Sequence, residues 1–163
     1  MKETICDVRW EGPTKWDRRG KLLAIHHVLY ALYGTHHLYG QSVLLYIGMT
    51  RVDLGSRLAG HVSWVKEEYD VISIRAASIG TSTTIDGWWS SWESNPDRPY
   101  KKKPHPDLVT DVESLLIYAH QPAYNSQGKS YLNRKGDQLI RIFNTGKSGT
   151  LLPELSTAYF EGE

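Results

Sequence analysis

Three polar side chains have types and spacing suited to phosphate chemistry. Tyr46 lies in the apolar run 43–47, a glycine follows that run, and Arg57 and His61 stand four residues apart in the helical pattern that comes next. Residues four apart share one face of a helix, so adjacent elements would bring a phenol, a guanidinium and an imidazole together. A guanidinium binds phosphate through a planar fork, and a phenol or an imidazole can transfer a proton. We interpret these three as candidate site residues.

A fourth candidate, Glu113, lies in the apolar helical segment 108–119, close in angle to Val109 and Leu116. A carboxylate at the border of a buried face is costly unless it is paired, protonated or bound to a cation. A solvated helix edge is the alternative, and the helical pattern alone does not decide between the two. Asp111 lies opposite the apolar stripe and needs no such explanation.

Longer spacing connects these candidates. Residues 113–125 read ESLLIYAHQPAYN, and residues 46–48 read Tyr-Ile-Gly, with Arg57 and His61 downstream. Together these motifs resemble the GIY-YIG nuclease superfamily, in which a helix carries a metal-binding glutamate and a Pro-x-Tyr-Asn segment follows it. The resemblance covers roughly residues 25–127 and includes both halves of the site.

The resemblance carries over to six positions of this sequence. They are Tyr30, Tyr46, Arg57, His61, Glu113 and Asn125. The first motif departs from the family pattern, because residues 28–30 read Val-Leu-Tyr and lack the glycine, and Tyr33 is a rival for the role of Tyr30. Met49 stands where some relatives have lysine. Asn125 would orient the site through its amide donors and acceptor.

The resemblance implies an enzyme that hydrolyses DNA phosphodiester bonds with a divalent metal, Mg²⁺ or Mn²⁺, held by Glu113. Such a reaction needs a base for the attacking water and positive charge beside the phosphate. Arg57 would supply that charge. Tyr46 would serve as base or proton relay, and Tyr30 would assist it by a hydrogen bond. His61 would relay the proton or contact the phosphate.

A restriction-like or mobile-element endonuclease is favoured over a repair nuclease, because no partner-binding module follows the motifs. One site cuts one strand, so a double-strand break would need a homodimer or a second encounter. Three alternatives stay open: a DNA-binding module on the same fold that does not cut, a repair nuclease, and a nuclease directed at RNA.

Composition restricts the class of protein. The chain has 163 residues, 40% of them hydrophobic, which is enough for one domain with its own core. No apolar run approaches the roughly 18 residues that span a bilayer, and the N-terminus lacks the apolar centre of a signal peptide, so we expect a cytoplasmic protein. The single Cys6 excludes an intramolecular disulfide. A net charge of +1 means that any phosphate-binding surface must come from local clustering.

The histidines also invite a metal interpretation. His26-His27 and His36-His37 are adjacent pairs. Neighbours on a strand point to opposite faces, so each pair is expected to be a poor chelate.

Apolar and polar alternation then predicts the elements that position the site. A hairpin is expected, because two β-branched and aromatic runs flank a polar loop at 35–41. Its alternation puts Tyr30 and Tyr46 on the same side of neighbouring strands if the strand register matches. Asp53 is the expected N-cap of the first helix, and Asp107 that of the second. The expected strands are 25–33, 42–47 and 71–79, and the expected helices are 53–67 and 108–120.

Between the third strand and the second helix lies an insertion, 80–106, that is too long for an ordinary loop. Its aromatic and basic residues could stack on bases and contact phosphates, or the tryptophans could simply pin the insertion to the domain. The candidate nucleic-acid-binding residues are Trp88, Trp89, Trp92, Arg98, Lys101, Lys102 and Lys103.

The expected fold is therefore a small α/β (α+β) domain spanning residues 1–163. A central, mainly antiparallel sheet of three or more strands is flanked by helices in a core at 25–127. Residues 1–20 are expected to form an N-terminal arm, and residues 128–163 a C-terminal extension with one added strand at 138–143.

Overall fold

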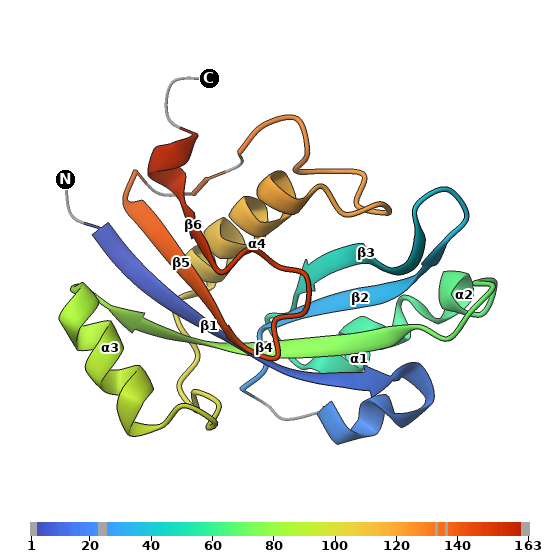
Figure 1. Cartoon of the computed structure of the whole chain (residues 1–163), viewed down its shortest axis with the longest axis horizontal. Helices are drawn as coiled ribbons and strands as arrows, with labels where there is room; N and C mark the ends of the chain where they lie inside the picture. The colour runs from blue at the N-terminus through green and yellow to red at the C-terminus, as the bar shows by residue number, and fades with distance from the viewer. Residues whose placement is uncertain (1–2, 23–25, 133, 136, 161–163) are drawn as a thin grey trace.

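A mixed, curled β-sheet organises the protein (Figure 1). The computed structural model describes residues 3–22, 26–132, 134–135 and 137–160. Within those residues the strand order is β3-β2-β4-β1-β5-β6. The strands are β1 (Glu3–Lys15), β2 (Leu29–His36), β3 (Gly40–Met49), β4 (Ser73–Ser82), β5 (Leu139–Gly146) and β6 (Glu154–Ser156). The expectation of an α+β domain is confirmed, but the sheet is larger than expected.

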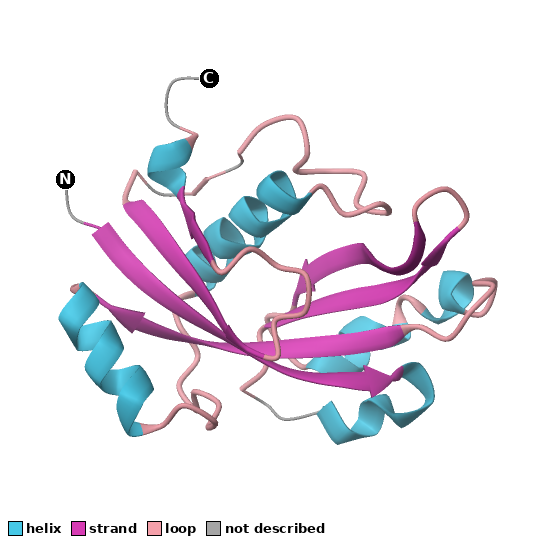
Figure 2. Ribbon diagram, viewed as in Figure 1, coloured by secondary structure: helices cyan, strands magenta, loops and turns pink. Residues whose placement is uncertain are grey.

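Helices cover both faces of this sheet (Figure 2). On one face α4 packs Val112 and Leu115 against the strands, and on the other α1 and the 3-10 helix η1 pack Leu58 and Leu22. The helices are η1 (Trp16–Leu22), α1 (Leu54–Ala59), α2 (Val62–Val65), α3 (Ile85–Ser94), α4 (Pro106–His120) and η2 (Thr157–Tyr159). Among the described residues, no helix combines the length and the apolar character needed to cross a bilayer.

The expected hairpin is present as β2 and β3, which pair antiparallel. Tyr30 lies opposite Gly48, and Leu32 lies opposite Tyr46. Directly opposed residues share a face of the sheet, so Tyr30 and Tyr46 lie diagonally on one face, as predicted. The third expected strand is β4, which pairs with β2 on the other side.

Residues 3–20, the described part of the expected N-terminal arm, do not form an arm. Most of them belong to β1, which lies in the middle of the sheet, antiparallel to β4 and parallel to β5. The sequence concealed this strand because Asp7 and Arg9 alternate with apolar residues yet are themselves buried. Residues 12 and 13, Gly-Pro, fall where the register with β4 shifts, a position at which a strand tolerates proline.

The C-terminal extension is also part of the sheet. The added strand expected at 138–143 is β5, and its parallel pairing with β1 makes the sheet mixed rather than mainly antiparallel around a small core. β6 then pairs antiparallel with β5.

The helix expected at 53–67 is divided into α1 and α2, with Gly60 and His61 between them. Glycine weakens a helix interior, which explains the break. The predicted cap is confirmed, because Asp53 Oδ1 accepts a hydrogen bond of 2.7 Å from Ser56 N.

The second helix begins two residues earlier than expected. His105, not Asp107, is its N-cap, and Gln121 ends it in a left-handed conformation at φ 50°. Asp111 is buried rather than exposed, because its carboxylate accepts a hydrogen bond from the backbone N of Lys135.

The insertion is held to the centre of the sheet by a buried ion pair. Arg9 Nη2 lies 2.7 Å from Asp7 Oδ2 and 2.8 Å from Tyr100 Oη, and Arg9 Nη1 donates to the Arg98 carbonyl at 2.6 Å. Tyr100 also packs over Gly80, where an added Cβ would lie 2.7 Å from Tyr100 Cδ1. These contacts fix the path of the chain between α3 and α4.

Candidate active site

Four of the six expected site residues meet beside the edge strand β3. Tyr46 of β3, Arg57 of α1, Glu113 of α4 and Asn125 line one cavity of about 370 Å³. This edge strand lies between α1 on one face of the sheet and α4 on the other, so side chains from both faces meet beside it. Segments that are far apart in sequence thus enclose a single cavity.

Asn125 fixes the chain after α4 to this edge. Its side-chain Oδ1 accepts from Ile47 N, and its Nδ2 donates to Ile47 O, both at 2.9 Å. The backbone N–H groups of Ala123 and Tyr124 donate to the Leu44 and Leu45 carbonyls. Residues 123–125 therefore cover the exposed side of β3, and the amide of Asn125 is used for structure rather than left free.

Tyr30 and His61 lie behind the cavity and contact each other. Tyr30 Oη is 2.7 Å from His61 Nε2, and Trp64 Nε1 donates to His61 Nδ1 at 3.0 Å. An indole N–H only donates, so Nδ1 is the unprotonated nitrogen and Nε2–H donates to the Tyr30 oxygen. Both ring nitrogens of His61 are therefore engaged with protein side chains.

The burial of this pair determines its protonation. Burial, helped by the charge of Arg57, lowers the pKa of His61 to about 4, so the imidazole is neutral near pH 7. Burial and the neighbouring Tyr46 raise the pKa of Tyr30 well above its ordinary value, although Arg57 acts in the opposite direction. Tyr30 is therefore a neutral phenol at physiological pH.

Gly48 makes room for the two tyrosines. Their ring centroids are 6.0 Å apart, and a Cβ at position 48 would lie 2.5 Å from Tyr30 Cζ and 2.8 Å from Tyr46 Cε1. Tyr33 packs in the other core, and its hydroxyl lies near Thr150. Of the two rivals, the structure thus places Tyr30 beside Tyr46.

Glu113 is a half-buried carboxylate in a positively charged surrounding. Burial raises its pKa to about 6, while a hydrogen bond to the backbone of Met49 and the charges of Arg57 and Arg51 lower it. Arg57 and Glu113 also line an adjoining cavity of about 460 Å³, formed by residues 49–53 and 56. These two side chains thus stand between two open spaces, where an extended ligand could contact both.

The oxygen donors fit a hard divalent cation. Mg²⁺ retains several waters and takes one or two carboxylates together with substrate phosphate. Glu113 offers one carboxylate, and Thr110, Ser126 and Gln127 add neutral oxygens to the same cavity. The carboxylate of Asp53 lines the adjoining cavity but is hydrogen-bonded to Ser56 through both oxygens.

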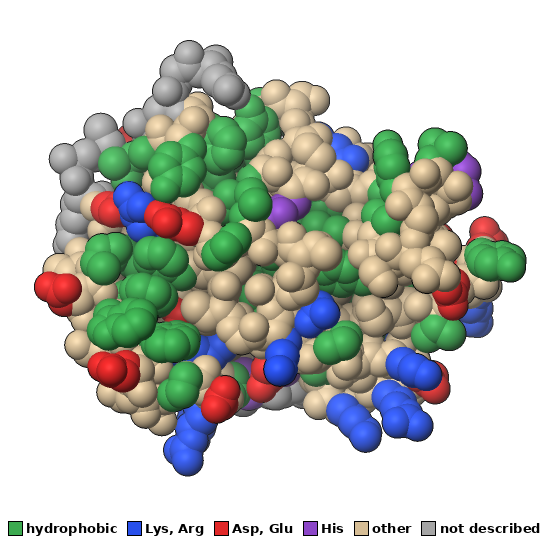
Figure 3. Space-filling view, in the orientation of Figure 1, with side chains coloured by type: hydrophobic (Ala, Val, Ile, Leu, Met, Phe, Trp, Pro, Cys, Tyr) green, Lys and Arg blue, Asp and Glu red, His purple; other side chains and the backbone are tan. Residues whose placement is uncertain are grey.

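The aromatic part of the insertion forms α3. Trp88 stacks on Phe143 of β5 with ring centroids 4.0 Å apart, which anchors the helix to the sheet. Trp89 is half exposed, and Trp92 lies 5.2 Å from it, centroid to centroid. Apolar side chains gather over this part of the surface in Figure 3.

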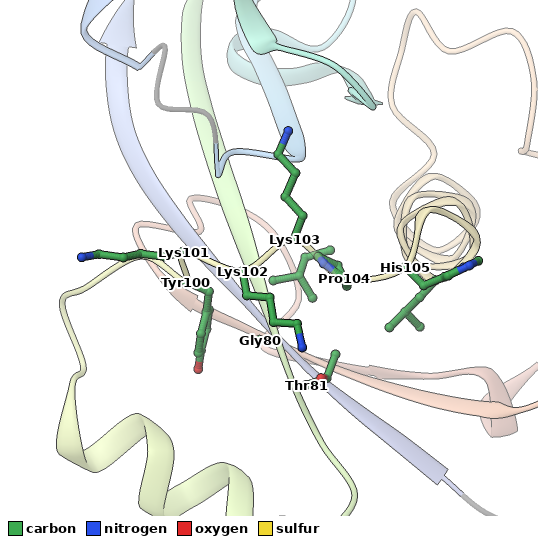
Figure 4. A pocket seen from close by; sticks show the side chains of 10 residues that line it. Gly80, Thr81, Tyr100, Lys101, Lys102, Lys103, Pro104 and His105 are labelled. Carbon is green, nitrogen blue, oxygen red and sulfur yellow. The ribbon is translucent and has the colours of Figure 1, made fainter.

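The basic part of the insertion follows α3 and does not form one cluster. Lys101, Lys102 and Lys103 line a separate cavity, and their side chains point in different directions (Figure 4). Lys103 Nζ donates to the Val52 carbonyl at 3.0 Å. Val52 lines the cavity of about 460 Å³, so this lysine lies beside that cavity. The Arg98 side chain is exposed, and its carbonyl binds Arg9.

Sequence reasoning missed two residues that position the site. Trp64 holds His61, and its only signal is a spacing of three residues from that histidine. Arg9 holds the insertion, but its partners Arg98 and Tyr100 lie some ninety residues away, and no local pattern indicates them.

Comparisons with protein-family models, curated proteins and solved structures found no significant match.

Proposed function

We propose that the protein is a divalent-metal-dependent endonuclease that hydrolyses DNA phosphodiester bonds. The observation that carries this proposal is the meeting of Tyr46, Arg57 and Glu113 around one cavity beside β3. A phenol, a guanidinium and a carboxylate at one cavity supply a proton acceptor, a phosphate ligand and a cation ligand. The sequence resemblance to GIY-YIG nucleases supports the same assignment.

In this proposal Glu113 holds the cation, and Arg57 binds the scissile phosphate through its planar fork. When bound, Mg²⁺ or Mn²⁺ would stabilise negative charge on the phosphate and the leaving oxygen. Arg57 lines both cavities, so its guanidinium would lie beside a phosphate bound in either one. There it would stabilise the negative charge that develops on the phosphate during cleavage.

Tyr46 is the tyrosine that we assign to proton transfer. It lines the cavity and is only partly buried, whereas Tyr30 is fully buried and does not line it. An unperturbed phenol is a weak base at neutral pH, so Tyr46 would need the positive charge of Arg57 and the cation beside it. Tyr30 and His61 act as positioning residues that hold the Tyr46 ring, which lies 4.7 Å from the imidazole, centroid to centroid.

DNA is the proposed substrate, with Lys103 and the exposed Trp89 of α3 as further contacts. A restriction-like or mobile-element role is proposed, and concerted cleavage of both strands would require a homodimer.

The test is nicking of supercoiled plasmid with Mg²⁺ by the parent and by Glu113→Gln and Arg57→Ala. We expect each substitution to lower the nicking rate by about 100-fold or more, because each removes a group that stabilises charge in the transition state. Glu67→Gln and Arg18→Ala are matched controls, since both side chains are exposed and neither lines the two cavities. They should retain parental activity.

Filter binding of the same DNA separates the alternatives. A parent that binds duplex DNA but nicks no substrate would favour the binding module and refute the enzyme. Competition between duplex DNA and RNA identifies the preferred nucleic acid.

A further inference from the structure

Glu11 of β1 and the histidines before β2 form a cluster outside the candidate active site. One ligand atom from each of Glu11, His26 and His27 lies within 4.8 Å of the other two. None of the three residues lines the cavities that contain Arg57 and Glu113. The endonuclease proposal thus makes no use of this cluster.

His26 and His27 do not lie in a strand, so they need not point to opposite faces as the sequence pattern predicts. β2 begins at Leu29, so the pair precedes the strand and is free of its alternation. The two rings lie 4.7 Å apart, centroid to centroid, and both approach the Glu11 carboxylate.

The hydrogen bonds of His27 prepare its Nε2 as a ligand. Nδ1 lies 2.6 Å from the Leu22 carbonyl, which only accepts, so Nδ1 carries a proton. Nε2 then directs its lone pair at Glu11 Oε2, with which it is in direct contact. Two acceptors in direct contact need a proton between them, and a metal ion that binds both atoms can replace this proton. A backbone carbonyl that fixes the distal nitrogen is the usual support of a metal-binding histidine.

His26 supplies a nitrogen without a partner. Its Nε2 is buried, and within the described part of the chain it has no hydrogen-bond partner. A buried polar atom in this state is costly, and a metal ion would satisfy it. Burial and the charges of His27, Lys101 and Lys103 lower the pKa of His26, although Glu11 raises it, so this imidazole is neutral.

We propose that Glu11, His26 and His27 bind one divalent transition-metal ion of the Zn²⁺ class. Two imidazoles and a carboxylate are a ligand set that Zn²⁺ accepts, with a water as the fourth ligand, whereas Mg²⁺ prefers oxygen. Zn²⁺ bonds of about 2.1 Å place tetrahedral ligand atoms roughly 3.4 Å apart, so small side-chain rotations suffice. The ion displaces the proton that joins His27 to Glu11. It also connects β1, through Glu11, to His27, which precedes Tyr30 by three residues.

The test is a Zn²⁺ titration of the untagged, EDTA-dialysed protein against a chromophoric chelator, with thermal unfolding as a second readout. We expect one Zn²⁺ per chain, not displaced by millimolar Mg²⁺, and a rise in Tm on binding. His26→Ala should weaken Zn²⁺ binding at least tenfold and reduce the rise in Tm accordingly.

His36→Ala is the matched control, because His36 and His37 are also an adjacent pair with rings 4.6 Å apart, but His36 Nδ1 already accepts from Leu38 N. It should bind Zn²⁺ as the parent does, and so should Glu113→Gln, which removes the proposed catalytic ligand. Glu11→Gln provides a second variant at a partly exposed side chain if His26→Ala fails to fold. A parent that binds no Zn²⁺ in the micromolar range, or ligand variants that bind it as tightly as the parent, would overturn the proposal.

Discussion

Replacing Gly48 by alanine tests the packing of the two site tyrosines without reference to catalysis. The added Cβ would lie 2.5 Å from Tyr30 Cζ and 2.8 Å from Tyr46 Cε1, both closer than real Cβ atoms approach their neighbours. Tyr30 is fully buried, so its ring has no open space to enter. The substitution must displace at least one of the two rings.

The expected cost combines two opposing effects. Overpacking of a well-packed core costs about 1–3 kcal/mol. Alanine restricts the unfolded chain more than glycine does, which returns about 0.4–1 kcal/mol. The free energy of unfolding should therefore fall by about 1–2 kcal/mol, which for a domain of this size corresponds to a Tm lowered by roughly 2–8 °C.

Urea and thermal unfolding measure this change, and plasmid nicking shows whether the displaced rings matter for activity. Gly60→Ala is the matched control, because its added Cβ would meet no atom closer than 3.4 Å and its backbone is helical at φ −65°. It should be as stable as the parent or slightly more stable. If Gly48→Ala is as stable as Gly60→Ala, the two rings do not pack over position 48 and the described site geometry is wrong.

Arg9→Met leaves the buried Asp7 carboxylate without its cation and should lower the free energy of unfolding by about 3–5 kcal/mol, measured in urea; parental stability would contradict this. Tyr30→Phe removes the acceptor of the His61 N–H, which should cost about 1–3 kcal/mol, and retained stability would disprove that hydrogen bond. Glu113, with a pKa raised to about 6, loses its charge as the pH falls. Mg²⁺-dependent nicking should therefore decline below about pH 6, and a flat profile between pH 5 and 7 would count against its role.

Local patterns predicted the elements that carry most of the site. Alternation was sufficient for the β2–β3 hairpin and for the shared face of Tyr30 and Tyr46, because each strand is short and paired with its neighbour in sequence. The same holds for the Asp53 cap and for the helix that carries Glu113. These features depend on interactions within a few residues or across one turn.

The errors occurred where distant residues determine the structure. The sequence does not predict β1 because Gly12 and Pro13 interrupt its pattern, and because Tyr100 and the Arg98 carbonyl, which satisfy the buried Asp7 and Arg9, lie some ninety residues away. Asp111 was read as exposed because the backbone group that binds it, Lys135 N, follows 24 residues later. Charged residues buried with partners far along the chain leave no periodic signal, so a sequence pattern cannot show them.

The central place of β1 has a consequence for how the chain acquires its structure. It is the earliest strand of the sheet to be synthesised, yet both of its neighbours, β4 and β5, come from residues 73–82 and 139–146. Its backbone cannot pair with β4 before residues 73–82 are synthesised, nor with β5 before residues 139–146 are. Pairings between distant segments form slowly, and the unpaired strands are prone to aggregate until they form. Productive expression should therefore benefit from chaperones or low temperature.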